Sequence, residues 1–368
     1  MNKESIYQIA LTLVPKVGDV IAKKLIAYCG SAEAVFMEPR KNLMRIPGVG
    51  SVLANTIVSK DLLSAAEFEL RFMEQNGVCP VYFKDDDYPF RLKQCVDSPI
   101  VLYQKGSEVN LNAKRIISIV GTRKATDYGL RITEQIVQDL SQLDDVLVVS
   151  GLAYGVDVAA HKACLKYNLP TIGVLAHGLD RMYPSVHKKI SEEMQRQGAL
   201  LSDFTSGNRP ERENFPKRNR IIAGLADATL VVEARKKGGA LITADIANSY
   251  SRDVFAVPGR VGDENSEGCN QLIRRNQAAL IQSADDICYL MGWDADSEKK
   301  NAKQVELFIE LNKDEEALLG VLSSKEKLSI DLIALQAKLS IPKILQVLLQ
   351  LELKGLVRSL PGNEYAKA

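Results

Sequence analysis

The feature that most limits the fold of this chain is a repeated pairing of a hydrophobic segment with a glycine-bearing turn. Six buried-type strands are expected near residues 115–120, 146–150, 171–176, 199–203, 228–234 and 253–257, with helices between them. Continuous runs of branched apolar residues are typical of parallel strands that are covered on both faces. The sequence therefore predicts an α/β protein with a doubly wound, Rossmann-like parallel sheet.

Glycine turns follow four of these strands. Three lie in the segments Ile116–Lys124, Val146–Asp157 and Gly173–Pro184, and the fourth, Lys236–Ala244, follows the strand expected at Ala228–Ala234. In open α/β sheets, ligands bind beyond the carboxyl ends of the strands, where glycines let backbone amides approach a phosphate. A single glycine turn is often purely structural, but four at neighbouring strand ends favour one composite anion site.

The segment Asn214–Arg220 adds cations and an aromatic ring next to those turns. It reads Asn-Phe-Pro-Lys-Arg-Asn-Arg and looks like a loop, because it shows no apolar periodicity. Guanidinium groups suit phosphate oxygens, and an aromatic ring suits a base that is not held in a duplex. The alternative is a helix start whose cations pair with Glu211 and Glu213. The neighbouring glycine turns favour the anion site.

The overall charge does not indicate a nucleic-acid partner, since the net charge is only +1. A DNA site must therefore come from local clustering of cations. Two basic patches meet this requirement, one between Arg209 and Arg220 and one between Arg115 and Arg131.

Several motifs resemble those of the DNA-processing protein A family, DprA, also called Smf. They are Ile119-Val-Gly-Thr-Arg123, Ser150-Gly-Leu-Ala-Tyr-Gly-Val-Asp-Val-Ala-Ala-His161, Gly178-Leu-Asp-Arg-Met-Tyr-Pro184, Phe215-Pro-Lys-Arg-Asn-Arg220, Gly239-Ala-Leu-Ile-Thr-Ala244 and Val254-Phe-Ala-Val-Pro-Gly259. The resemblance covers roughly residues 70 to 290. It implies a protein that binds single-stranded DNA and helps to load the RecA recombinase during natural transformation. It also implies a homodimer formed through the end of the sheet domain.

The motifs and the turns together give the expected DNA-binding residues. These are Gly121, Thr122, Arg123, Lys124, Gly151, Tyr154, Gly155, Arg212, Phe215, Lys217, Arg218, Asn219, Arg220, Lys237, Gly238 and Gly239. Two positions depart from the family pattern. Tyr154 stands where the family usually has Arg, which exchanges a cation for a stacking surface, and the run Lys236–Gly239 has Gly where Ser is usual.

A nucleotide-cleaving enzyme is the alternative function, because phosphoribohydrolases share this fold. Those enzymes carry a glutamate soon after a glycine-rich segment, whereas here the run from Lys237 has no carboxylate until Asp245, which we expect on a helix. A Walker motif and a Ser/His/Asp set of recognisable spacing are also missing. Asp157 and Asp180 could be catalytic, but capping a helix or ordering a turn explains them better. We therefore expect a non-catalytic protein without a cofactor or metal.

The cysteines and the apolar runs indicate a cytoplasmic protein. The six cysteines are scattered without a CxxC pair, and the three histidines do not complete a metal-ligand set with them. We expect His161 to be packed in a helix, while His177 could touch DNA. No apolar run approaches the ~20 residues of a membrane span, and no signal peptide is recognisable.

Three domains and a linker are expected. Residues 1–65 contain two copies of a helix-hairpin-helix (SAM-like) pattern, Val14–Leu25 and Ile46–Ile57, whose turn amides could bind a DNA phosphate or simply pack as a structural unit. Residues 66–293 form the extended Rossmann-like domain, with a strand at Val78–Phe83 and a turn at Tyr103–Gly106.

Residues 294–304 read as a polar linker, and residues 305–368 as a winged helix. Its helices are expected at Asp314–Ser323, Ser329–Leu339 and Pro342–Lys354, followed by a two-stranded wing. We expect the leucines of the third helix to form core. Because its few exposed polar residues give little cationic charge, a protein-contact or accessory role is favoured over duplex binding.

Overall fold

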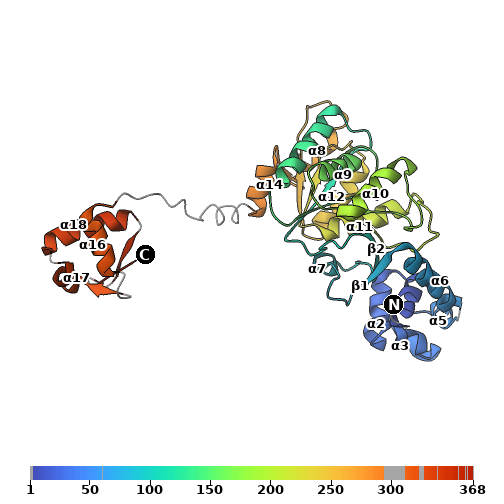
Figure 1. Ribbon diagram of the computed structural model, residues 1–368. Helices are drawn as coiled ribbons and strands as arrows, with labels where there is room; N and C mark the ends of the chain where they lie inside the picture. Colours follow the sequence, from blue (N-terminus) through green and yellow to red (C-terminus); the bar gives the residue numbers. More distant parts are fainter. Residues whose placement is uncertain are drawn as a thin grey trace. The chain divides into compact units, whose positions relative to one another are not determined.

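The computed structural model describes residues 3–59, 61–293, 311–322, 327–337, 339–354, 356–360, 362 and 364–367. The chain forms two compact units, Met1–Asp294 and Ala295–Ala368 (Figure 1). The linker expected at residues 294–304 lies outside the described residues.

The first unit contains a nine-stranded sheet in the order β1-β2-β6-β5-β4-β3-β7-β8-β9. The strands are β1 (Val78–Tyr82), β2 (Val101–Gly106), β3 (Arg115–Val120), β4 (Val146–Ser150), β5 (Thr171–Val174), β6 (Ala199–Ser202), β7 (Ala228–Val231), β8 (Asp253–Ala256) and β9 (Ala279–Leu280). All neighbours from β6 to β9 pair in parallel, whereas β2 is antiparallel to both β1 and β6. Starting at β3, the chain adds strands on one side of the sheet, through β4 and β5 to β6. It then returns to the other side of β3 with β7 and continues to β9, so the direction of winding reverses between β3 and β7. The doubly wound sheet predicted from the sequence is confirmed.

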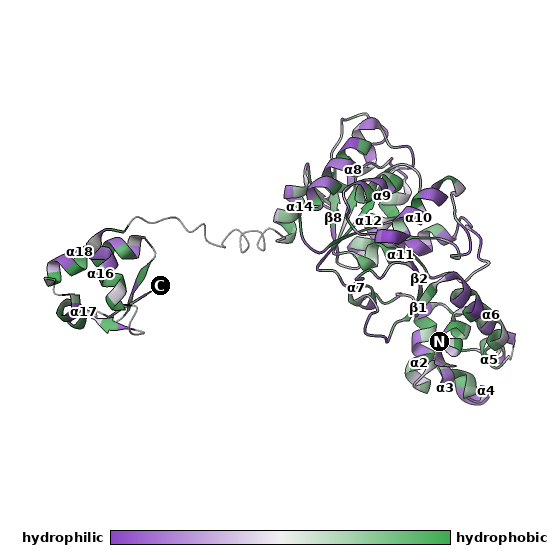
Figure 2. Ribbon diagram, viewed as in Figure 1, coloured by the Kyte–Doolittle hydropathy of each residue, from purple (hydrophilic) through white to green (hydrophobic). Residues whose placement is uncertain are grey.

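Helices cover both faces of this sheet. They are α7 (Phe90–Lys93), α8 (Asp127–Leu140), α9 (Val156–Lys166), α10 (Lys188–Gln197), α11 (Asn214–Leu225), α12 (Gly239–Ser249), α13 (Glu267–Arg274) and α14 (Ala284–Met291), with a short 3-10 turn at Ser185–His187. Successive side chains of β3 point to opposite faces: Ile116 and Val120 pack with α11 and α12, and Ile117 and Ile119 pack with α8 and α9. In Figure 2 the helices carry hydrophobic and hydrophilic stretches side by side, as helices with one buried face do.

The turn expected at Tyr103–Gly106 is wrong, because these residues belong to strand β2, which runs to Gly106. The ring of Tyr103 is buried, and the strand pairs with β1 on one side and β6 on the other. Gly106 then ends the strand with a positive φ of 137°. The prediction that this region extends the sheet is confirmed.

Six helices precede the sheet: α1 (Lys3–Leu13), α2 (Asp19–Cys29), α3 (Ala32–Met37), α4 (Arg40–Leu43), α5 (Ser51–Ile57) and α6 (Asp61–Asn76). The two expected hairpins have matching backbone bonds, from the amide of Val17 to the carbonyl of Val14 and from Val49 to Ile46. Residues of these helices share one hydrophobic cluster with β1, β2 and α10. The boundary predicted at residue 65, between the helical domain and the sheet domain, lies inside one compact unit and stays a proposal.

The second unit contains α16 (Lys313–Leu322), β10 (Leu328–Ser329), α17 (Ile330–Ala337), α18 (Ile341–Leu353), β11 (Val357–Leu360) and β12 (Glu364–Lys367). Its strands form a sheet in the order β10-β12-β11. The three helices and the wing agree with the predicted winged helix. The expectation that the leucines of the third helix form core is partly wrong, since Leu345 and Leu349 of α18 are exposed. Ile344, Val347, Leu348 and Leu351 already fill the buried face of that helix.

Among the described helices, none is by itself long and apolar enough to cross a bilayer. The bent pair formed by α17 and α18 meets the length and composition criteria together. Both helices contribute buried residues, such as Ile333 and Leu348, to the core of the winged helix.

Candidate nucleic-acid interface

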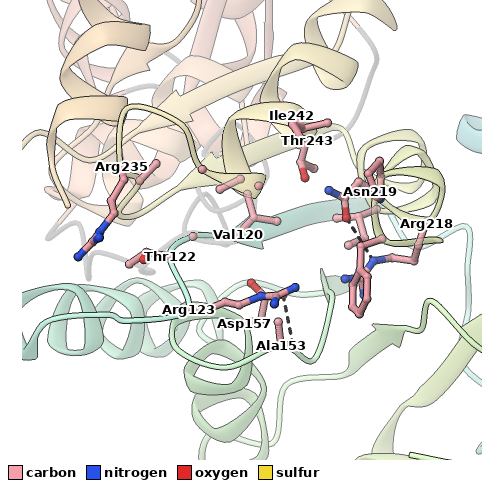
Figure 3. A pocket seen from close by; sticks show the side chains of 18 of the residues that line it. Val120, Thr122, Arg123, Ala153, Asp157, Arg218, Asn219, Arg235, Ile242 and Thr243 are labelled. Carbon is pink, nitrogen blue, oxygen red and sulfur yellow. Dashed lines mark hydrogen bonds between the residues drawn. The ribbon is translucent and has the colours of Figure 1, made fainter. Parts of the chain in front are cut away.

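A cavity of about 260 Å³ opens beyond the carboxyl ends of β3 and β7, where the winding of the sheet reverses (Figure 3). A doubly wound sheet binds its ligands at such a point, because the loops after the two strands diverge and leave a crevice. Its walls include nine residues expected from the sequence, namely Gly121, Thr122, Arg123, Phe215, Arg218, Asn219, Lys237, Gly238 and Gly239.

The loop after β3 is held by the segment that follows β7. The amide of Thr122 donates to the carbonyl oxygen of Glu233 at 2.7 Å, and the Glu233 carboxylate accepts from the amide and the hydroxyl of Thr126. Thr126 in turn caps the start of α8. The loop after β4 presses against the same segment, because Gly155 has a φ of 76° and a Cβ there would collide with the carbonyl oxygen of Thr122. The cavity wall carrying Arg123 is therefore fixed from two sides.

Arg123 and Phe215 form the exposed cationic and aromatic part of the cavity. The Arg123 side chain is exposed, and its guanidinium carbon lies 5.2 Å from the centroid of the half-buried Phe215 ring. The ring of Tyr183 lies 6.1 Å from that of Phe215, edge to face. Phe215 does not lie in a loop as expected, since α11 begins at Asn214. Pro216 suits the first turn of that helix, where its missing N–H costs no hydrogen bond.

Arg218 lies in the cavity wall, but its guanidinium is occupied inside the protein. The residue is only 4% exposed, and Nη1 donates to the carbonyl oxygens of Gly151, at 2.7 Å, and of Val174. A Cβ on Gly151 would lie 2.6 Å from this guanidinium, so glycine is needed there for close approach. Burial lowers the pKa of Arg218 to about 10. Arg218 thus lines the cavity as expected, but with a guanidinium bound to backbone carbonyls; it shapes the wall and adds buried positive charge.

Arg220 is not part of the cavity, which corrects a second expectation. It lies two residues after Arg218 on the helix and therefore points in another direction. Its Nη2 pairs with Asp203 at 2.6 Å and with Asp19 at 2.9 Å, and Nη1 donates to the carbonyl oxygen of Asp97. Burial alone would lower the pKa of Arg220, but Asp203 and Asp19 raise it above its ordinary value.

These contacts also assign a role to the first helical hairpin. Besides Arg220, the Asp19 carboxylate accepts from the amide of Ile100 at 2.9 Å, and Lys23 Nζ donates to Ser98 at 2.5 Å. The start of α2 is therefore used to dock the hairpin onto the sheet. For this copy, the contacts favour the structural alternative over a DNA phosphate.

Asp157 is the one carboxylate among the described residues that line the cavity. It lies in the first turn of α9, which has no side-chain cap, and accepts from the amide of Ala153 in the preceding loop at 3.4 Å, which agrees with the expected alternative of ordering a turn. Burial raises the pKa of Asp157, and the nearby charge of Arg218 opposes this rise. The expected helical position of Asp245 is confirmed as well, since it lies exposed on α12.

The opposite wall is formed by the loop after β7 and the start of α12. Gly238 is the N-cap of this helix, and the amides of a first helical turn lack partners within the helix. Arg235 also lines the cavity, with Nη2 at 3.1 Å from the Glu264 carboxylate. The sequence prediction missed Arg235, although its place directly after a predicted strand is a usable signal.

The remaining expected residues lie around the cavity. Gly151 is behind the wall, Lys124 and Gly155 line a neighbouring groove, and Arg212 and Lys217 are exposed but do not line the cavity. Tyr154 is 48% exposed, and its ring packs edge-on against His187 at 5.1 Å.

The histidines and cysteines do not add a second site. His177 is 1% exposed and is held by Gly178 and Tyr183, so it is not available for the DNA contact that the sequence left open. His161 is packed as expected, with Nδ1 at 2.8 Å from the hydroxyl of Thr171. In the part of the chain that the structure describes, no group of three or more His, Cys, Asp or Glu residues could hold a metal ion.

Comparison with known proteins identifies two family models in this chain. Residues 80–292 match the model described as DNA recombination-mediator protein A, and residues 308–363 match the DprA winged helix domain. The chain is 34% identical over 400 residues to Protein Smf of Synechocystis, covering 100% of this chain and 99% of that relative. It is 38% identical over 203 residues to DNA processing protein DprA of Streptococcus pneumoniae, covering 55% and 71%.

Two solved structures are similar as well. DNA processing protein A from Streptococcus pneumoniae has a TM-score of 0.63 and 30% identity, covering 78% of this chain and 98% of that one. The Helicobacter pylori protein, solved to describe its single-stranded DNA binding mode, has a TM-score of 0.53 and 27% identity, covering 59% and 96%. These matches confirm the family resemblance and the α/β fold with a C-terminal winged helix.

Proposed function

Since this chain belongs to the DprA (Smf) family, we propose that it is a non-catalytic single-stranded-DNA-binding protein that protects incoming DNA and loads RecA during natural transformation. The observation that carries the binding proposal is the cavity at the reversal of the sheet. It combines an exposed guanidinium (Arg123), an aromatic ring (Phe215) and a helix start (Gly238) within one crevice.

The chemistry of these groups suits a single strand. Arg123 and Lys237 supply cations for phosphate oxygens, and the first-turn amides of α12 supply further donors. A base can stack on Phe215 only when it is not paired in a duplex. The printed description of the Helicobacter pylori relative, a single-stranded DNA binding mode, supports the same ligand.

The presence of one acidic residue among the described residues that line the cavity supports a binder over a nucleotide-cleaving enzyme. Asp157 is buried, holds the amide of Ala153 and lies within the electrostatic influence of Arg218. General acid–base cleavage needs a carboxylate that reaches a reacting atom in the correct protonation state. Asp157 is used instead to order the loop, and no cofactor or metal is included in the proposal.

The rest of the proposal concerns assembly and location. A homodimer through the end of the sheet domain is supported by strand β9, which among the described strands pairs only with β8 and so leaves a sheet edge open. We place the protein in the cytoplasm, with RecA as its protein partner and without membrane attachment. The domain division into residues 1–65, 66–293 and 305–368 belongs to the same proposal.

A gel-shift titration of single- and double-stranded DNA of one length across a salt series tests the binding function. Tighter binding of the single strand, with an affinity that falls as salt rises, is expected because phosphate contacts release counterions. Equal affinity for both DNA forms would contradict the proposal. Release of free base from nucleoside monophosphates by the purified protein would replace it with the phosphoribohydrolase alternative.

A further inference from the structure

A second depression, of about 480 Å³, lies between helices α8 and α9 and reaches the cavity described above. Both are lined by Arg123, which stands where they meet. The floor of the depression is apolar and includes Leu130 from α8 and Val158 and Ala159 from α9. This depression is called the α8/α9 groove below.

One face of α9 builds the groove along its whole length. Gly155, Ala159, Lys162 and Lys166 line it at intervals of three or four residues, which places them in one row along the helix. Because the side chain of Ala159 is small, it leaves space above the helix, and Lys162 and Lys166 follow further along the same row. The result is an apolar trough with cations at its rim.

The charge of the groove is strongly one-sided. Arg123, Lys124, Lys162 and Lys166 line it together with a single carboxylate, that of Glu134. Glu134 is already paired with Lys166, whose Nζ lies 2.5 Å from its Oε1. Among the residues that the structure describes, no carboxylate lies within ion-pair distance of Lys162, which is exposed on the helix surface. Three cations of the groove therefore remain for an external anion.

We infer that the α8/α9 groove is a second subsite for the same DNA strand, which leaves the cavity past Arg123 and continues along α9. Phosphates of this part of the strand contact Lys124 and Lys162, and a base lies on the apolar floor at Val158 and Ala159. The inference rests on the proposed single-strand binding. Continuity with the cavity and the unmatched positive charge favour a nucleic-acid strand over an apolar peptide, which would need no cationic rim.

The experiment measures affinity against strand length. Oligo-dT molecules from about 4 to about 30 nucleotides, a range that brackets the usual site sizes of single-strand binders, are titrated with the full chain across a salt series. The wild-type protein is compared with Lys162→Glu and, independently, with Lys124→Glu. Lys93→Glu is the control, because it makes the same charge change at an exposed residue of α7. The buried Arg91 of α7 pairs with Asp227 just before β7, at the amino ends of the strands, whereas the cavity lies beyond their carboxyl ends.

For short oligomers, which the cavity alone accommodates, Lys162→Glu is expected to bind like the control. For long oligomers it is expected to lose the extra affinity, and the slope of log K against log salt is expected to fall by about 0.7 for one lost phosphate contact. The affinity of Lys124→Glu for oligo-dT should depend on strand length in the same way. The inference can therefore be tested with either variant if the other does not fold.

Two outcomes overturn the inference. Lys162→Glu could bind oligomers of every length like Lys93→Glu, which would leave the groove to another ligand such as an acidic protein segment. It could also weaken short and long oligomers equally, which would make Lys162 part of the cavity itself. A wild-type protein that binds no single strand at any length would instead refute the proposed function.

Discussion

Replacing Arg220 by Ala separates a structural arginine from a DNA ligand within a single motif. The Arg220 side chain is 14% exposed, and its guanidinium binds two carboxylates, Asp203 at 2.6 Å and Asp19 at 2.9 Å. Asp203 is itself 10% exposed, and burial already raises its pKa. Without Arg220, this carboxylate stays buried without a cation, and the first helical hairpin loses one of its attachments to the sheet.

The expected loss of stability can be estimated from these contacts. Removing one partner of a buried ion pair costs about 3–5 kcal/mol. The lower end applies here, since Asp19 is 24% exposed and can recover some hydration. For a unit of this size, each kcal/mol lowers the melting temperature by about 2 °C, so Arg220→Ala should melt about 6 °C below the wild type. Adding Asp203→Asn should recover part of this loss of stability, because the buried negative charge that has lost its cation is then removed.

The assay pairs thermal denaturation with the salt dependence of single-strand binding. Arg220→Ala should lower the melting temperature and leave the slope of log K against log salt unchanged. The matched variant Arg123→Ala should do the opposite: its exposed side chain contributes little to stability, and the slope should fall by about 0.7. An Arg220→Ala protein of normal stability with a reduced slope would refute the reasoning and make Arg220 a phosphate ligand.

Three further predictions follow from the burial of single residues and from the two compact units. Phe215→Ala should lose about 1–3 kcal/mol of single-strand affinity, measured by titration, with little change in melting temperature if the ring stacks on a base. Burial lowers the pKa of His161 to about 3 from 6.5, so only the unfolded chain takes up this proton as the pH falls below 6.5. Stability should therefore drop by about 2 kcal/mol between pH 7 and pH 5, and this part of the drop should be missing in His161→Leu when both are unfolded in denaturant. A chain of residues 1–293 should keep most of its single-strand affinity, since it retains the cavity; a folded truncated protein that no longer binds would contradict this division.

The strands could be predicted because their signal is local. Each predicted strand is a short run of branched apolar residues followed by a turn. All six strands predicted from this pattern are present as β3 to β8, and most of them end one to three residues away from the predicted end. The segment Tyr103–Gly106 of strand β2 resembles a turn because Gln104, Lys105 and Gly106 end the strand with polar residues and a glycine. Its pairing with β6, almost 100 residues later, decides its structure and is not visible in the local pattern.

The roles of the arginines on α11 were less predictable, because their partners are distant in the sequence. Asp19 is 201 residues from Arg220, and the carbonyls that bind Arg218 belong to Gly151 and Val174. One local signal was available. Asn214, Arg218 and Ile222 are all buried and follow each other at intervals of four, which is the period of a helix face turned towards the sheet. Treating this segment as a loop concealed that period.

The exposed positive charge of the cavity therefore comes from a different source than the most basic segment of the sequence. Of the three cations in the Phe-Pro-Lys-Arg-Asn-Arg motif, Arg218 and Arg220 are bound inside the protein, and Lys217 does not line the cavity. The exposed cations of the cavity lie instead on the loops after β3 and β7, and they are Arg123, Arg235 and Lys237. Buried Arg218 joins the ends of β4 and β5 to α11 through the carbonyls of Gly151 and Val174, and Phe215 lies less than one helical turn before it. The motif thus fixes the shape of the crevice and presents the ring, while the strand-end loops supply the charge that a phosphate requires.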